Sequence, residues 1–250
     1  MEILALAITA IAGVAMGAIN NVAGGAGVLA LLAFEHLHGL PLSLANPSSR
    51  IAAVAIGTFS FLGFLRAGRR PPPRAWLQGL MAVPGALLGS NLALSLPDLA
   101  FRCYLAAMLV LLLRQQLKPA PIGEQPQRPA WVAALGCFLI GLHMGFAQIG
   151  TGLVAALVLA GAYRRDMIAV NMAKSTVVIT TSLASAGTFV LSGNVVWVPA
   201  LTLAAGAAVG SYLASHWSVA KGNAAISRVV VVIAALTLVE QLWEIGRALW

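Results

Sequence analysis

Two basic side chains inside long apolar segments, Arg50 and Lys174, are the residues best placed to do chemistry in this sequence. A charge within a bilayer is costly, so such a residue faces a cavity, a partner or a bound ion by default. We expect Lys174 to bind an anion, because its segment begins near Asp166 and it lies about 12 Å along that helix. Arg50 lies closer to a predicted helix start at Asn46-Pro47, so anion binding and snorkelling to the interface are both open for it.

Two glycine-rich stretches, Gly17–Gly27 and Gly145–Gly152, interrupt apolar runs in corresponding places of the two halves of the chain. Glycine weakens a helix interior and asparagine competes for backbone hydrogen bonds, so we expect a helix break at each stretch. Backbone N–H groups freed at membrane depth need protein, water or a ligand, and the positive end of a half-helix attracts anions. Close packing of helices through small residues is the alternative explanation for these glycines.

The two breaks and the starts of the two cation-bearing segments together form the predicted substrate site. Its candidate anion-binding residues are Asn20, Asn21, Gly24, Gly25, Gly27, Asn46, Ser48, Ser49, Arg50, Gln148, Gly150, Thr151, Gly152, Asn171, Lys174 and Ser175. His143, inside a predicted span, is the candidate for proton coupling, and a neutral histidine bonded within the bundle is the alternative. No catalytic residue, metal site or cofactor is predicted, and we interpret His36 and His38 beside Glu35 as polar loop residues.

These side chains must be positioned by membrane helices. The chain has 250 residues, of which 60% are hydrophobic and 9% charged, whereas a soluble domain carries about 25% charged residues. Ten apolar segments are predicted, at 3–19, 22–37, 47–65, 74–96, 99–117, 130–147, 151–163, 167–191, 195–217 and 225–246. The predicted fold class is therefore an all-α, polytopic integral membrane protein. Its net charge of +8 fits cytoplasmic loops rich in Lys and Arg, and we predict no nucleic-acid partner.

The two halves of the chain carry related motifs in the same order. The matching pairs are Gly13–Gly17 with Gly141–Gly145, Gly85–Ala93 with Gly206–Ala214, and Asn46–Arg50 with Asn171–Ser175. Small-xxx-small helix packing is expected at Gly13 with Gly17, Gly85 with Gly89, and Gly206 with Gly210. We assign residues 1–117 to a first membrane repeat, 118–129 to a cytoplasmic linker and 130–250 to a second membrane repeat.

The charges of matched linkers predict the orientation of the two repeats. The linker between the third and fourth segments holds Arg66, Arg69, Arg70 and Arg74, whereas its counterpart at Ser192–Asn194 is uncharged. By the positive-inside rule these linkers lie on opposite faces, which predicts an inverted repeat with the central loop in the cytoplasm and both termini outside it. The second segment of each half is short, so tilted spans and hairpins that meet near the midplane are both open.

With these residues in view, the chain resembles the TauE/SafE family of sulfite and organosulfonate exporters over nearly its whole length. The resemblance rests on the glycine-rich break after the first segment, the Asn/Ser-rich start of the third, the Gly85-x-x-x-Gly89-Ser90-x-Leu92-Ala93 motif of the fourth, and the duplication. It implies transport of small sulfur-containing anions across the bacterial inner membrane, coupled to the proton gradient.

We therefore predict a multi-pass secondary transporter of the bacterial inner membrane for a sulfite-like oxyanion or an organosulfonate, with that anion and the lipid bilayer as its partners. A passive anion channel is the first alternative, although polar residues clustered at one depth do not form the continuous ring that a pore needs. A membrane-embedded enzyme is the second alternative, and no nucleophile–base or metal constellation supports it. The substrate, the direction of transport, the coupling ion and the oligomeric state are left open.

Overall fold

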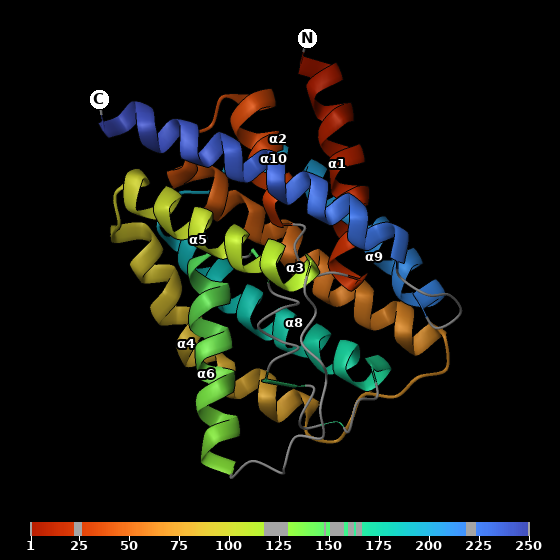
Figure 1. Ribbon diagram of the computed structural model, residues 1–250. Helices are drawn as coiled ribbons and strands as arrows, with labels where there is room; N and C mark the ends of the chain where they lie inside the picture. Colours follow the sequence, from red (N-terminus) through yellow and green to blue (C-terminus); the bar gives the residue numbers. More distant parts are fainter. Residues whose placement is uncertain are drawn as a thin grey trace.

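The computed structural model describes residues 2–22, 27–117, 130–147, 149–150, 158–159, 163, 167–218 and 224–249, and within these ranges the regular structure is entirely helical (Figure 1). The helices are α1 (Glu2–Val22), α2 (Gly27–His38), α3 (Leu42–Arg66), α4 (Ala75–Ser95), α5 (Asp98–Leu117), α6 (Ala130–Phe146), α8 (Met167–Leu191), α9 (Trp197–Ser218) and α10 (Ala224–Leu249). The predicted central linker 118–129 and most of the seventh segment, 151–163, lie outside the described residues.

The length and composition of these helices confirm the all-α, polytopic membrane fold. Helices α1, α3, α4, α8 and α9 are each long and apolar enough to cross a bilayer, whereas α2 and α6 are shorter apolar helices. The 12 residues of α2 span about 18 Å, well short of the roughly 30 Å hydrocarbon core. The short α2 agrees with the short second segment predicted for the first half.

Two predicted helix boundaries are wrong. Helix α3 begins at Leu42 rather than near Pro47, with Pro41 at the N-cap position and Pro47 inside the helix. Proline is tolerated there because the carbonyl that loses its N–H partner belongs to Ser43, an exposed residue in the first turn. Helix α1 likewise continues through Gly17 and ends only at Val22, rather than at residue 19 as predicted.

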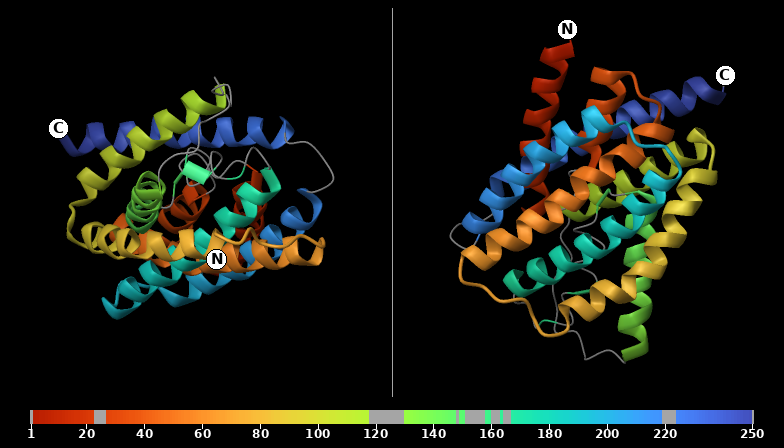
Figure 2. Two further views of the ribbon diagram at one scale, coloured as in Figure 1. Left: turned by 90° about the horizontal axis from the view of Figure 1, so that it is seen from below. Right: turned by 180° about the vertical axis from the view of Figure 1, so that it is seen from behind.

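The helices of the two halves pack on each other reciprocally. Helix α1 lies along α9, and α6 lies along α4; α3 contacts α9 and α8, and α8 also contacts α4. Helices α5 and α10 pack together and lie on one side of the other helices (Figure 2). The first helix of each half, α1 or α6, thus crosses the fourth helix of the other half, α9 or α4. The inverted repeat stays a prediction, and this exchange of partners supports it.

Glycines create the closest of these crossings. A Cβ atom added to Gly13 or Gly17 would lie 2.3 Å from a carbonyl oxygen of α9, and one added to Gly206 or Gly210 would lie 2.0 Å from a carbonyl oxygen of α1. In the matching crossing, the corresponding distances are 2.1 Å at Gly85, 2.2 Å at Gly89, 1.9 Å at Gly141 and 2.2 Å at Gly145. The backbones therefore touch at both crossings, which confirms the predicted small-xxx-small packing.

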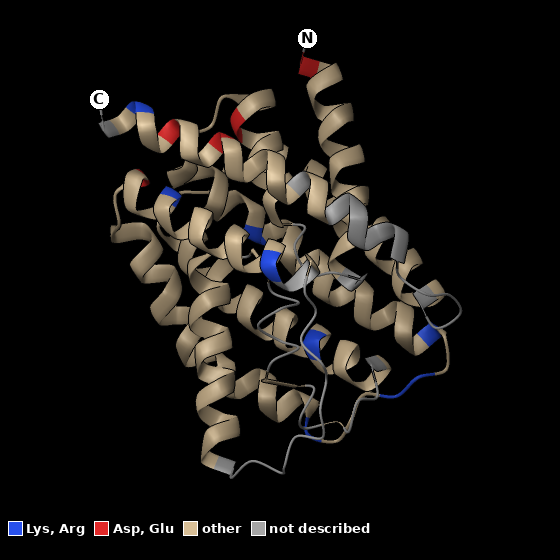
Figure 3. Cartoon of the chain, viewed as in Figure 1, with Lys and Arg blue, Asp and Glu red and all other residues tan. Residues whose placement is uncertain are grey.

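Charge is distributed unevenly between the two ends of the bundle. In the described part of the chain, the acidic residues gather at the end that carries both termini, whereas the arginine-bearing linker between α3 and α4 lies at the opposite end (Figure 3). This asymmetry supports a cytoplasmic position for the α3–α4 linker and an external position for the termini. The membrane orientation stays a prediction.

Candidate functional site

Arg50, a buried cation of the first half, donates hydrogen bonds to the end of a helix from the second half. Arg50 is 0% exposed and lies eight residues into α3, about 12 Å from its start. Its Nη1 donates to the carbonyl oxygen of Met144 at 2.6 Å, and its Nη2 donates to that of Phe146 at 3.1 Å. These are among the last carbonyls of α6, which have no partner within their own helix. The burial of Arg50 excludes the snorkelling alternative.

Asn46, one turn before Arg50, completes this contact. Its Nδ2 donates to the Phe146 carbonyl at 3.0 Å, and its Oδ1 accepts a hydrogen bond from Arg50 Nη2 at 2.7 Å. The predicted capping role of Asn46 at the start of α3 is therefore replaced by a tertiary role. Its amide oxygen orients the Arg50 guanidinium, and its amide nitrogen donates a second hydrogen bond to the Phe146 carbonyl at the end of α6.

The cation of the second half makes the equivalent contact with the first. Lys174 is 5% exposed and lies seven residues into α8, about 10 Å from its start. Its Nζ donates to the carbonyl oxygen of Asn20 at 2.8 Å, in the last turn of α1. A cation placed at the carbonyl end of a helix also interacts favourably with the helix dipole. Both cations therefore contact the carbonyl end of a helix from the opposite half.

The two helix ends lie in one region of the protein. A single buried apolar cluster includes Met16 and Ile19 from the last turns of α1, Val28 from α2, Phe146 at the end of α6, and Ile149 beyond that end. The sequence-predicted residues Asn20, Asn46, Arg50 and Lys174 are thus positioned around helix ends that share a core. Helices α3 and α8, which carry the cations, also contact each other.

His143 lies beside this region and has a partner for each ring nitrogen. Its Nε2 lies 2.6 Å from the Ile149 carbonyl, which can only accept, so Nε2 carries the proton. Its Nδ1 lies 2.5 Å from the hydroxyl of Tyr104, which donates to it when the ring is neutral. The Tyr104 ring packs edge-on against Phe146 with centroids 4.6 Å apart. Tyr104 was missed from the sequence, where a single tyrosine in the apolar fifth segment was the available signal.

The remaining predicted residues divide into three groups. Ser48 accepts the Val196 N–H at 2.9 Å and so caps the start of α9, whereas Ser49 and Ser175 bond carbonyls of their own helices, those of Asn46 and Asn171. Gly27 begins α2 and is buried, and Gly150 has a φ of 70°, which favours glycine. Outside the described residues, or with undescribed side chains, are Asn21, Gly24, Gly25, Gln148, Thr151 and Gly152.

A second polar cluster, not predicted from the sequence, joins the end of α2 to two other helices. The Glu35 carboxylate pairs with Arg102 of α5 at 2.8 Å, and Arg102 also donates to Gln241 of α10 at 3.0 Å. His36 pairs with Glu240 of α10 at 2.5 Å, so these residues end a helix rather than forming a loop. Among the described residues, no group of three or more His, Cys, Asp and Glu side chains could hold a metal ion.

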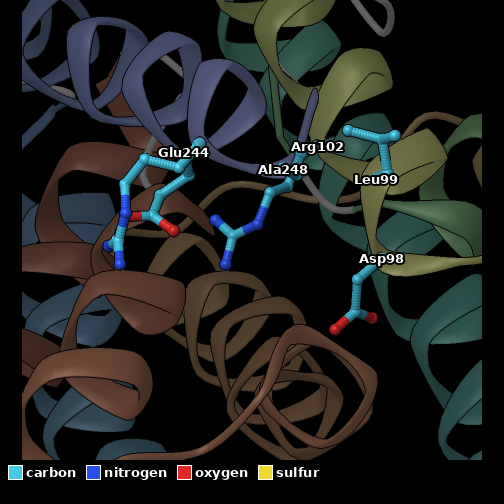
Figure 4. A pocket seen from close by; sticks show the side chains of 6 residues that line it. Asp98, Leu99, Arg102, Glu244 and Ala248 are labelled. Atoms are coloured by element: carbon cyan, nitrogen blue, oxygen red, sulfur yellow. Dashed lines mark hydrogen bonds and ion pairs between the residues drawn. The ribbon is translucent and has the colours of Figure 1, made fainter. Parts of the chain in front are cut away.

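A cavity of about 300 Å³ adjoins this cluster between α5 and α10 (Figure 4). Its lining residues are Asp98, Leu99, Arg102, Glu244, Arg247 and Ala248. The lining contains neither Arg50 nor Lys174, so this cavity is separate from the predicted substrate site. Opposite charges on its walls give it no preference for one sign of ligand.

Comparison with known proteins agrees with this architecture. The family model described as "Sulfite exporter TauE/SafE" matches residues 9–240. The chain belongs to the TauE/SafE family. A "Probable membrane transporter protein" of Haemophilus influenzae is 23% identical over 250 residues, covering 96% of each chain. No solved structure gives a significant match. Members of the TauE/SafE family are membrane transporters, and the predicted resemblance is confirmed.

Proposed function

We propose that this TauE/SafE protein is a proton-coupled secondary transporter that moves a small sulfur-containing anion, a sulfite-like oxyanion or an organosulfonate, across the bacterial inner membrane. The observation that carries the proposal is the pair of buried cations, Arg50 on α3 and Lys174 on α8, at the ends of α6 and α1. An inverted pair of repeats would bring these ends together near the middle of the bilayer.

The electrostatics of this region favour an anion. Backbone carbonyls carry only partial negative charge, whereas the guanidinium and the ammonium each carry a full positive charge. Oxygen atoms of a sulfite or sulfonate group accept charge-assisted hydrogen bonds, which are about twice as strong as neutral ones. The proposed site also includes the polar residues of the two glycine-rich stretches, 17–27 and 145–152. The N–H groups at the start of α2, where Gly27 is buried, would add positive potential.

His143 is the proposed proton-coupling residue. It lies on α6, three residues before the Phe146 carbonyl that Arg50 and Asn46 hold, and it is 8% exposed. A change in its protonation would alter its bonds to Tyr104 and Ile149 and hence the geometry of the α6 end. This arrangement links a titratable group to the cation region through one turn of helix.

The proposal is tested by anion binding to purified protein. Sulfite, sulfate, thiosulfate and short sulfonates are screened by thermal shift, because a bound ligand raises the melting temperature. We expect Lys174→Met to weaken binding of the best anion by more than tenfold, since removing one charge of a buried pair costs about 2–5 kcal/mol. Lys174→Arg, which keeps the charge, serves as the matched control. Retained affinity together with a collapse in melting temperature would make Lys174 purely structural.

A further inference from the structure

The last carbonyls of α6 are satisfied from another helix rather than by a local cap. The carbonyl of His143 accepts the Ala147 N–H at 2.9 Å, which continues the helical pattern by one residue. The carbonyls of Met144 and Phe146 instead accept the side chains of Arg50 and Asn46. A buried carbonyl without a partner costs free energy comparable to a lost hydrogen bond, and lipid offers no substitute.

The end of α1 is held in the same manner. Lys174 donates to Asn20, three residues after the second glycine of the Gly13–Gly17 motif. In the other half, Met144 and Phe146 flank the second glycine of the matching Gly141–Gly145 motif. The two contacts therefore fall near the carbonyl ends of two helices that carry matching motifs, and each one joins opposite halves of the chain.

We propose that Arg50 and Lys174 are positioning residues, each of which fixes a helix of the opposite half by binding its carbonyl end. Arg50, oriented by Asn46, positions the end of α6, and Lys174 positions the end of α1. The inference rests on the proposed function only in taking these ends as part of the transport site. The planar guanidinium of Arg50 donates to two carbonyls in a fixed geometry. The ammonium group of a lysine has a single nitrogen, so it would constrain the positions of two carbonyls less.

The earlier turns of both helices are held by other means. The glycine crossings pack α6 against α4 and α1 against α9. The last glycines in close backbone contact are Gly145 in α6 and Gly17 in α1. Beyond those glycines, Arg50 and Asn46 of α3 bond the end of α6, and Lys174 of α8 bonds the end of α1. Loss of one cation therefore loosens one helix end, on the opposite half, and leaves the rest of the bundle in place.

The experiment is hydrogen–deuterium exchange on the full-length protein in detergent, with no sulfur-containing anion present. Arg50→Met is expected to speed amide exchange in residues 143–147 about tenfold, the equivalent of about 1.4 kcal/mol, and to leave residues 17–22 unchanged. Lys174→Met is expected to do the reverse. Arg50→Lys, which can still donate to a carbonyl, should give intermediate exchange at 143–147.

The control is Arg102→Met, which removes a partly buried guanidinium whose partners are Glu35 and Gln241 and should change exchange at neither helix end. Faster exchange at both ends in each variant would indicate general destabilisation and overturn the inference. Unchanged exchange at both ends would overturn it as well. Sulfite binding to the same variants separates the two proposals: loosened ends with unchanged sulfite affinity support positioning and contradict the anion site. Weaker sulfite binding with unchanged exchange supports the anion site and overturns positioning.

Discussion

Substitution of Gly141 by alanine tests the close crossing of α6 and α4 directly. The added Cβ would lie 1.9 Å from the Ala82 carbonyl oxygen, with the Ala82 carbonyl carbon at 2.8 Å. Carbon atoms reach their optimal packing at about 3.5–4.0 Å, so the two helices must separate by more than roughly 1 Å. The contacting atoms belong to the backbone and cannot rotate away, so the whole crossing has to shift.

The free-energy change follows from two opposing terms. Overpacking of a close-packed interior costs about 1–3 kcal/mol, and a rigid backbone contact places Gly141→Ala at the upper end of that range. Alanine is favoured over glycine in a helix by about 1 kcal/mol, which offsets part of the loss. We expect a net destabilisation of about 2 kcal/mol, or a fall in melting temperature of about 4–8 °C for a chain of this size.

Gly187→Ala is the matched control, because Gly187 lies in a helix but has no atom within 4 Å of an added Cβ. It receives the helix-propensity gain without the clash, so its melting temperature should rise by about 2–4 °C. The measurement is thermal unfolding of the purified variants in the same detergent. Gly206→Ala, whose Cβ would lie 2.0 Å from the Ala10 carbonyl oxygen, should repeat the loss at the second crossing. Equal melting temperatures for Gly141→Ala and Gly187→Ala would refute the close crossing.

Three further predictions concern topology, coupling and stability. Single cysteines placed in Arg69–Pro73 and in Ser192–Asn194 should react with an impermeant thiol reagent from opposite faces of the membrane; reaction from one face would end the inverted-repeat interpretation. His143→Gln should flatten the pH dependence of sulfite transport into proteoliposomes while sulfite binding is kept, and an unaltered pH profile would leave His143 with a structural role. Arg102→Met should lower the free energy of unfolding by about 1–3 kcal/mol because it leaves the partly buried Glu35 carboxylate unpaired, whereas the exposed ion pair lost in Arg247→Met should cost less than about 1 kcal/mol; equal losses in chemical denaturation would contradict the difference in burial between the two pairs.

The membrane class and most helix positions follow from the sequence because hydropathy is a local property. A bilayer requires long apolar helices wherever the chain crosses it, so apolar runs and their lengths locate the spans. The paired glycine motifs also identified the helices that cross most closely, because only small residues allow backbones to touch. Family membership followed from the same motifs and their order.

The partners of the buried cations were decided by the tertiary structure alone. The depth of Arg50 and Lys174 could be counted from the sequence, but the groups they face are distant in the chain: Phe146 lies 96 residues from Arg50, and Asn20 lies 154 residues from Lys174. Those partners are backbone carbonyls, which every residue carries, so no residue type marks them.

The start of α3 and the two missed contacts have a similar origin. Asn46 before Pro47 has the local pattern of a helix start, yet its side chain is used by the end of α6, and the helix begins five residues earlier than Pro47. Tyr104 and the Glu35–Arg102 pair are joined to their partners only by the packing of α5. Capping and helix propensities are worth about 1 kcal/mol each, so buried bonds between distant segments override them.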